Sequence, residues 1–348
     1  MGNHVRGSNF SPAHPTLGAQ TIHVPVGEPT LFVVVDTEEE FDWSRPFARE
    51  NTSVTAIRQL PVLQDLLDRY NIRPTYVIDY PVATNPISAP VIRTLYESGR
   101  CAVGAHLHPW VNPPYTEEVT PANSFASNLG YELERAKLTA LTDAIDTHVG
   151  VRPKIYKAGR YGFGLSTVGV LEALEYTIDV SVNPYMDYSD QRGPNFERFD
   201  PRPFSFGSNG TLLEVPCTLG FAGFLRRYGQ PLHRLVDTGI WRALRLPGIL
   251  SRAGALNKIM LSPETSTLSE MQAVTRALLA DGVRTFSLTL HSPSVEPGHT
   301  PYVRTAADRR AFLDRIAAYC DFFLGSLAGV PATLDDFRQM YVAGGAAA

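Results

Sequence analysis

The chain has 348 residues, of which 44% are hydrophobic and 19% are charged, a composition typical of a globular protein with a large core. Its formal net charge of −4 and isoelectric point near 6.1 provide no basic field for a phosphate backbone, so we expect no nucleic-acid partner. No signal peptide and no apolar run of roughly eighteen residues is present, so we expect a cytoplasmic protein without a membrane partner.

Apolar runs and amphipathic segments alternate along the chain. Residues 31–35 form a short apolar, β-branched run that predicts a buried parallel strand, and 55–70 carry apolar residues at helical spacing. Further strands are predicted in 72–80, 101–110, 154–162, 176–182, 212–221 and 285–293, and further helices over 90–98, 131–149, 167–174, 266–281 and 307–324. This order predicts an α/β protein with a parallel sheet covered by helices.

The predicted domain organisation is one domain over residues 25–340. Residues 1–24 lack periodicity and are rich in Gly, Pro, Ser and His, which predicts a flexible arm, and 341–348 predict a flexible tail. Two long segments, 187–206 and 219–263, exceed ordinary strand–helix connections and are interpreted as insertions at the rim of the sheet.

Polar residues fall where the predicted strands end, at Asp36, His106, Arg160, Asp179 and His291. The carboxyl ends of parallel strands meet at one rim, where α/β proteins place their sites. No GxGxxG follows the first strand, which favours a (β/α) barrel over an open dinucleotide-binding sheet.

The segment VVVDTEEEFDW contains five carboxylates within seven residues. These groups repel one another unless they are solvated or neutralised by a cation, so a solvated acidic loop is the alternative to a metal site. Asp36 and Glu38 share one face of an extended chain, so one can bind a metal while the other takes a proton from its water. His106 and His108 also share a face, and two imidazoles with a carboxylate form a common zinc site.

Other polar residues of the rim have two interpretations each. His291 is placed as a general acid for a leaving amine or alcohol, or as a buried structural histidine. Arg160, in a KAGRYG segment that also holds Lys157, either orients Asp36 and lowers its pKa or forms a plain salt bridge. Asp179 either positions His291 or caps a loop. Trp110 suits a wall for stacking sugars, or the core.

Other chemistries lack their motifs, since the sequence contains no GxSxG, P-loop or HExxH. The three widely spaced cysteines predict buried free thiols rather than disulfides. A retaining glycosidase stays open, with Asp36 or Glu38 paired with Asp179 or Glu214, but it leaves the histidines without a role.

The ordered motifs resemble the polysaccharide deacetylase family, carbohydrate esterase family four, from about residue 31 to about residue 324. The strings that carry the resemblance are DTEEEFDW, GAHLHPW, AGRYG and HSPSVEPGHTPYVR. The resemblance implies an irregular (β/α) barrel that removes an N- or O-acetyl group from a carbohydrate by metal-activated water. It also implies a divalent metal, with zinc expected, and assigns Asp36 as base, Arg160 as the residue that orients it, His291 as acid, and Glu38, His106 and His108 as metal ligands.

The sequence departs from the family pattern at three motifs. Thr37 separates the two acids, one residue separates the histidines instead of three, and the arginine follows Ala-Gly instead of preceding Pro-Pro. The leading hypothesis is hydrolysis of an N-acetyl group on a sugar, with Trp110, Tyr161 and Asp179 binding substrate and Tyr161 or backbone amides stabilising the oxyanion. The alternatives are a hydrolase of a small non-sugar amide on the same fold and a catalytically silent carbohydrate-binding protein. The sequence leaves the oligomeric state open.

Overall fold

The computed structural model describes residues 11, 17–21 and 27–345. Its main sheet has ten strands in the order β1-β7-β8-β6-β5-β4-β3-β2-β11, and β12 pairs beside β2. These strands are β1 (Gln20–Thr21), β2 (Thr30–Thr37), β3 (Thr75–Ile78), β4 (Ala102–Leu107), β5 (Ile155–Ala158), β6 (Ile178–Asp179), β7 (Phe204–Phe206), β8 (Leu212–Glu214), β11 (Thr285–His291) and β12 (Val330–Pro331). All pairings from β8 through β6 to β11 are parallel, while β7 and β1 are antiparallel.

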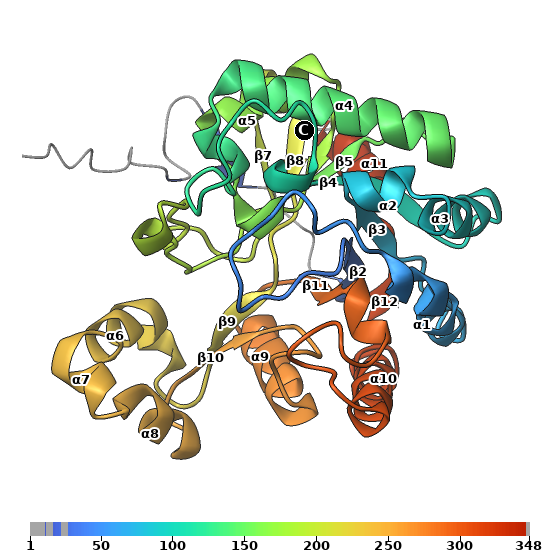
Figure 1. The fold of residues 1–348 in the computed structure, drawn as a ribbon. Helices are drawn as coiled ribbons and strands as arrows, with labels where there is room; N and C mark the ends of the chain where they lie inside the picture. Colours follow the sequence, from blue (N-terminus) through green and yellow to red (C-terminus); the bar gives the residue numbers. More distant parts are fainter. Residues whose placement is uncertain (1–10, 12–16, 22–26, 346–348) are drawn as a thin grey trace, which may run out of the picture.

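The sheet curls into a half-barrel with helices along its outer face (Figure 1). In the part of the chain that the structure describes, the strand path ends at β1 and β11 without a ladder between them, so the predicted irregular (β/α) barrel is confirmed. The helices of the barrel are α1 (Leu60–Asp68), α2 (Tyr80–Thr84), α3 (Ser88–Glu97), α4 (Tyr131–Val149), α5 (Leu165–Ala173), α9 (Leu268–Ala280), α10 (Ala306–Cys320) and α11 (Leu334–Gly345). Within the described residues, no helix has the length and apolar character needed to cross a membrane.

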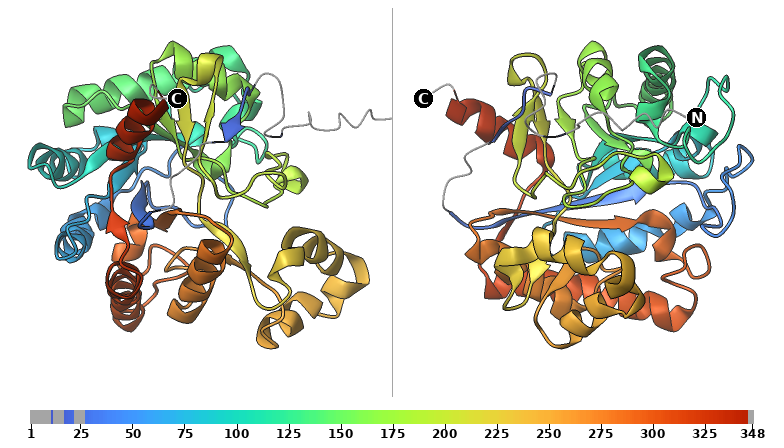
Figure 2. Two further views of the ribbon diagram at one scale, coloured as in Figure 1. Left: turned by 180° about the vertical axis from the view of Figure 1, so that it is seen from behind. Right: turned by 90° about the vertical axis from the view of Figure 1, so that its left-hand side faces the viewer.

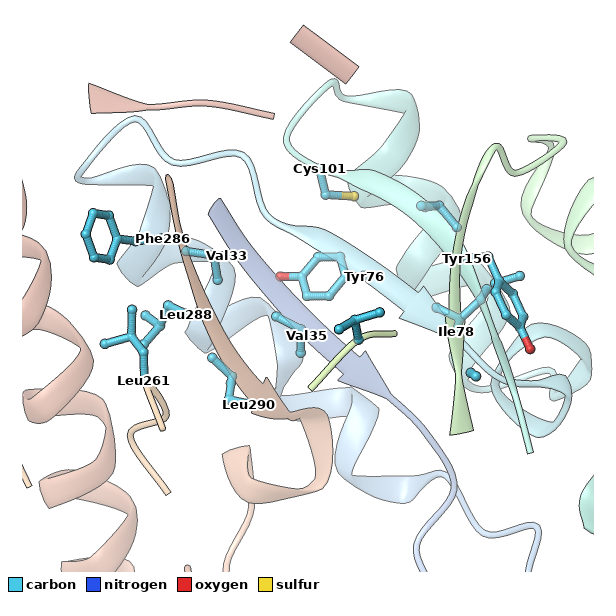
Figure 3. Close-up of a cluster of buried hydrophobic side chains, with 14 of the residues drawn as sticks. Val33, Val35, Tyr76, Ile78, Cys101, Tyr156, Leu261, Phe286, Leu288 and Leu290 are labelled. Atoms are coloured by element: carbon cyan, nitrogen blue, oxygen red, sulfur yellow. The ribbon is translucent and has the colours of Figure 1, made fainter. Parts of the chain in front are cut away.

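Side chains alternate between the two faces of each strand. Val33 and Val35 of β2 join Leu288 and Leu290 of β11 in the large core beneath the outer helices (Figure 3). The intervening residues Phe32 and Val34 belong to a second core on the inner face, where α11 also packs. Asp36 continues this inner alternation, which directs its side chain into the mouth of the barrel.

The long segment 219–263 is built on an antiparallel ribbon of β9 (Leu219–Ala222) and β10 (Asn257–Met260). Between these strands the chain forms α6 (Gly229–Val236), α7 (Gly239–Ala243) and α8 (Leu246–Arg252), which project from the barrel (Figures 1 and 2). At its base the ribbon joins the barrel, since Thr289 N of β11 donates to Leu261 O at 3.2 Å. We call residues 223–256 the helical excursion.

Several predicted boundaries are corrected. Residues 20–21 of the predicted arm form β1 and pair with β7, whereas 1–10, 12–16 and 22–24 lie outside the described residues. The predicted tail begins inside α11, and only 346–348 lie outside the description. The predicted strand 212–221 is two strands, because Pro216 has no amide to donate to a ladder. The three cysteines are buried free thiols, as predicted.

Candidate functional site

Four strands of the barrel direct polar side chains into one cavity at their carboxyl ends. The cavity has a volume of about 360 Å³. Its polar lining includes Asp36 in β2 and Glu38 after it, His106 in β4 and His108 after it, Lys157 in β5, His291 in β11, and Glu264 after β10. The parallel register places His291 directly beside Asp36 and His106 beside Lys157, so the rim predicted from the strand ends is present.

Glu38, His106 and His108 form a candidate metal centre. Glu38 Oε2 lies 3.5 Å from His106 Nε2 and 3.4 Å from His108 Nε2, and all three side chains are buried. One donor atom from each residue lies within 4.8 Å of the other two. Two imidazole nitrogens and one carboxylate oxygen that converge in this way fit a divalent cation and leave coordination positions open. The two histidines, although separated by only one residue, can therefore direct both Nε2 atoms toward a single cation.

The opposite ring nitrogens of both histidines are held by neighbouring groups. His106 Nδ1 donates to the carbonyl of Lys157 at 3.0 Å, and His108 Nδ1 lies 2.7 Å from Glu39 Oε2. Glu39 also accepts a bond from Trp110 Nε1 at 2.8 Å, and its amide donates to Asp79 at 2.6 Å. Such contacts fix the ring orientation and direct Nε2 toward a metal. No motif distinguishes Glu39 from the other acids of its segment or marks Asp79 for this role.

The surroundings of the candidate centre favour the protonation states in which His108 and Glu38 can bind a metal. Burial lowers the pKa of His108, which favours the neutral imidazole that a metal needs. Burial opposes ionisation of Glu38, but the imidazoles of His291, His106 and His108 outweigh it and lower the pKa of Glu38. By contrast, burial raises the pKa of Glu39 to about 8, so Glu39, which contacts His108, favours its protonated form, whereas Glu38 favours its ionised form.

Asp36 is a buried carboxylate that is paired with Lys157. Lys157 Nζ donates to both carboxylate oxygens, at 2.6 and 2.8 Å. Burial alone would raise the pKa of Asp36, but the ammonium of Lys157, with smaller contributions from His106 and His291, lowers it below its ordinary value. Asp36 is therefore ionised and can accept a proton within reach of the candidate metal centre.

His291 lies beside Asp36 and is held by Glu264. His291 Nδ1 lies 2.8 Å from Glu264 Oε2, its backbone amide donates to Glu264 Oε1 at 3.2 Å, and its Nε2 lies 3.8 Å from Asp36 Oδ2. Burial disfavours the imidazolium, but the carboxylates of Glu264, Glu38 and Asp36 outweigh it and raise the pKa of His291 to about 10. His291 is therefore a protonated group that can donate to a leaving atom.

No family model matches the sequence, and no curated protein matches it. Among solved structures, a Mycobacterium smegmatis protein assigned as a polysaccharide deacetylase superimposes with a TM-score of 0.51 at 15% identity, over 94% of this chain and 96% of that one. The chain has the fold of the polysaccharide deacetylases. Structural similarity also extends to a peptidoglycan N-acetylglucosamine deacetylase domain from Eubacterium rectale, with a TM-score of 0.40 at 10% identity over 90% of this chain and 92% of that one.

A third similar structure is a family 4 acetyl xylan esterase from Clostridium thermocellum in complex with a cobalt ion. Its TM-score is 0.36 at 14% identity, over 89% of this chain and 91% of that one. The superposition on the Mycobacterium smegmatis structure concerns the fold, and it confirms the fold that the sequence motifs predicted.

Within this deacetylase fold, Arg160 does not take the predicted position beside Asp36. It lies in the turn Gly159–Tyr161 with a φ of +53°, and its guanidinium bonds Ser124 and Gln191 and lies 4.2 Å from the ring centroid of Phe125. The predicted contact between Arg160 and Asp36 is therefore corrected. The cation that pairs with Asp36 is Lys157 of β5. Arg160 still lines the cavity, at its wall.

Asp179 is likewise placed away from the predicted site. Its neighbours Ile178 and Val180 belong to the inner core, so Asp179 faces the outer side of the sheet. There it accepts a bond from Ser181 at 2.6 Å, and its negative charge adds to the effect of burial in raising the pKa of the neighbouring Glu214. The predicted roles of Asp179 in substrate binding and in holding His291 are therefore wrong, and Glu264 is the partner of His291.

Aromatic side chains form the remaining walls of the cavity. Trp110 stacks on His108 with centroids 4.3 Å apart, and Trp43 meets His291 edge to face at 5.0 Å. Tyr161 stacks on Tyr188 at 5.7 Å. Both predicted substrate-binding aromatics, Trp110 and Tyr161, line the cavity, so substrate binding by them stays a prediction.

Proposed function

We propose that the chain is a metal-dependent hydrolase that removes an N-acetyl or O-acetyl group from a carbohydrate. The observation that supports this proposal most strongly is that three metal-type donors, on Glu38, His106 and His108, line the same cavity as a buried carboxylate and a protonated imidazole. Acyl transfer to water uses a base that takes the proton of the water and an acid that protonates the leaving atom. A glycosidase would leave the two histidines unused.

Glu38, His106 and His108 would hold the cation, for which we predict zinc, and a bound divalent ion polarises an acyl oxygen and lowers the pKa of water. Asp36, kept ionised by Lys157, accepts the proton of the attacking water at its carboxylate. His291, kept protonated by Glu264, donates its Nε2 proton to the departing nitrogen or oxygen. Trp110 and Tyr161 orient the acyl group and limit the access of bulk water.

A second candidate is hydrolysis of a small non-sugar amide at the same residues. The observation in its favour is the aromatic wall, because Phe41, Trp43, Phe47 and Tyr302 also line a cavity of only about 360 Å³. The same rings suit the apolar face of a pyranose. A screen of acetylated xylo- and N-acetylglucosamine oligomers against small linear and cyclic amides separates the two, since turnover of amides alone would replace the carbohydrate proposal.

Metal content tests the proposal before any substrate is known. We expect about one zinc per chain in protein whose His4, His14 and His23 are first replaced by Gln, and loss of that zinc in His106→Ala and His108→Ala. The matched control is His148→Ala, an exposed histidine of α4. Equal metal content in all variants would favour a silent carbohydrate-binding protein.

Activity tests the assigned base. Asp36→Asn should keep its zinc and lose roughly 100- to 10,000-fold in kcat, the contribution typical of a positioned general base. Full activity of this variant on every substrate of the parent protein would show that Asp36 is not the base.

A further inference from the structure

The helical excursion differs from the rest of the molecule in its surface. It contains six arginines and one acidic residue, in a chain with 31 basic and 35 acidic residues overall. It also carries most of the large apolar side chains that the described structure exposes, with 45% to 73% of their surface accessible; these are Phe224, Tyr228, Leu235, Ile240, Trp241, Leu244 and Ile249. Apolar and cationic groups are thus mixed on one projecting unit (Figures 1 and 2).

The apolar residues are exposed although the excursion has an interior of its own. Val236, Ala255 and Leu256 are buried, and helices α6, α7 and α8 contact one another. Ile240 and Trp241 of α7 share one side by helical spacing with Leu244, which directly follows the helix and whose amide donates to the carbonyl of Ile240 at 2.9 Å. The small cavity behind α8 is lined by other residues, so these side chains point elsewhere.

The arginines accompany this apolar surface. Arg227, Arg245 and Arg252 are exposed, and within the described residues no ion pair with them is found. Arg226 and Arg234 pair with Asp281 and Glu197 of the barrel and attach the excursion to it. Arginine beside exposed tryptophan, tyrosine and aliphatic side chains on short helices is the composition that enters the boundary between headgroups and acyl chains.

From this charge complementarity we infer that the helical excursion docks the protein onto an anionic phospholipid bilayer. The inference departs from the sequence-based expectation of no membrane partner, and it does not depend on the proposed hydrolase activity. The aliphatic tips and Trp241 enter the boundary of the bilayer, and the unpaired arginines contact lipid phosphates. A second copy of the chain fits less well, because a two-fold contact through this surface would bring the arginines of both copies together.

Flotation with lipid vesicles tests the inference on the full chain. Vesicles of phosphatidylglycerol and phosphatidylcholine should bind the protein, vesicles of phosphatidylcholine alone should bind it far less, and high salt should weaken binding. Each arginine near an anionic surface changes partitioning by roughly fivefold, so Arg245→Glu with Arg252→Glu should weaken binding by more than roughly tenfold. Ile240→Ser with Leu244→Ser should do the same through lost apolar contact.

The matched control is Arg135→Glu with Arg310→Glu, two exposed arginines of α4 and α10, which should bind vesicles nearly as the parent protein does. On binding, Trp241 fluorescence should shift to shorter wavelength, and this shift should be absent in Trp241→Phe. Equal affinity for both vesicle types, or equal loss in both arginine pairs, would overturn the inference. So would absence of vesicle binding, or a dimer in solution that Ile240→Ser with Leu244→Ser dissociates.

Discussion

The carboxylate of Asp36 lies in a buried environment that would normally favour its protonated form, and Lys157 reverses that preference. Lys157→Met removes the ammonium at 2.6 Å, so the pKa of Asp36 should rise. Because the base must be ionised, the acidic limb of kcat/KM against pH should move to higher pH, and activity near neutrality should fall by about 100-fold.

The double variant Asp36→Asn with Lys157→Met controls for this interpretation. It removes both charges, so it should be no less active than Asp36→Asn alone. Comparing its free energy of unfolding in urea with that of Lys157→Met shows whether the unpaired charge of Asp36 destabilises Lys157→Met. An acidic limb that stays in place in Lys157→Met would show that Lys157 does not set the protonation of Asp36.

Next to Asp36 in the cavity, Glu264 keeps His291 protonated. Glu264→Gln keeps an oxygen that can accept from His291 but removes the largest charge that raises its pKa to about 10. The pKa of His291 should fall, and the alkaline limb of kcat/KM should move to lower pH, because the acid must carry its proton. Rates measured from about pH 6 to about pH 10 check this, with Glu296→Gln as the nearby control.

The sequence predicted the central side chains of the site, but it did not predict their partners Lys157 and Glu264. Asp36, Glu38, His106, His108 and His291 could be found, because each follows or ends a recognisable apolar strand. Their partners have weaker signals. Lys157 lies two residues after Ile155 and shares the inner face of β5 with it. The alternation of side chains along this strand could therefore have selected Lys157 over Arg160. Glu264 lies in a loop 27 positions before His291, with no local pattern that connects the two.

At the level of elements, α4 and α5 meet through a buried acid on the outer side of the barrel. Glu134 of α4 accepts bonds from Ser166 at 2.8 Å and Thr167 at 2.6 Å, both in the first turn of α5. Burial outweighs these bonds and raises the pKa of Glu134 to about 7 from its ordinary value of 4.5.

This shift predicts how stability depends on pH. The folded state binds the proton more tightly, so its contribution to stability is fully present below pH 4.5 and is lost as pH rises through about 7. The loss amounts to roughly 3 kcal/mol for a shift of this size. Glu134→Gln should therefore gain about that much relative to the parent protein between pH 4.5 and pH 8, as measured by urea unfolding.

The control for this measurement is Glu132→Gln, an exposed acid in the same turn of α4. Its free energy of unfolding should follow that of the parent protein at both pH values. Parallel curves for Glu134→Gln and the parent protein would show that Glu134 titrates normally in the folded state.

Elements with a strong period were predictable, and those fixed by tertiary contacts were not. Helix α4 was predicted with its observed bounds, because a long amphipathic pattern begins after Gly130 and ends at Gly150, which has a φ of +86°. Strand β7 and helix α11 were missed. Short strands such as β7 carry little pattern, and α11 owes its position to the inner core that it covers, not to local sequence.

For the molecule as a whole, the barrel and the helical excursion are separable in the roles that we assign to them. Ala222 and Asn257 are direct partners in the β9–β10 register, so a two-residue Asn-Gly turn can replace residues 223–256. None of the proposed reacting side chains lies in that segment. We expect the shortened chain to fold, to keep kcat within about an order of magnitude on soluble substrate, and to lose vesicle binding.

The deletion should also raise KM, because the excursion supports one wall of the cavity. Arg234 of α6 pairs with Glu197, and Lys258 of β10 donates to the carbonyl of Tyr185 at 2.7 Å, in the loop that presents Tyr188 to the cavity. Glu197→Gln breaks the pair from the barrel side, so it should share part of the rise in KM while binding vesicles as the parent protein does. If the deletion abolished kcat while its thermal unfolding remained cooperative, the excursion would belong to the catalytic unit, and the separation of roles would be wrong.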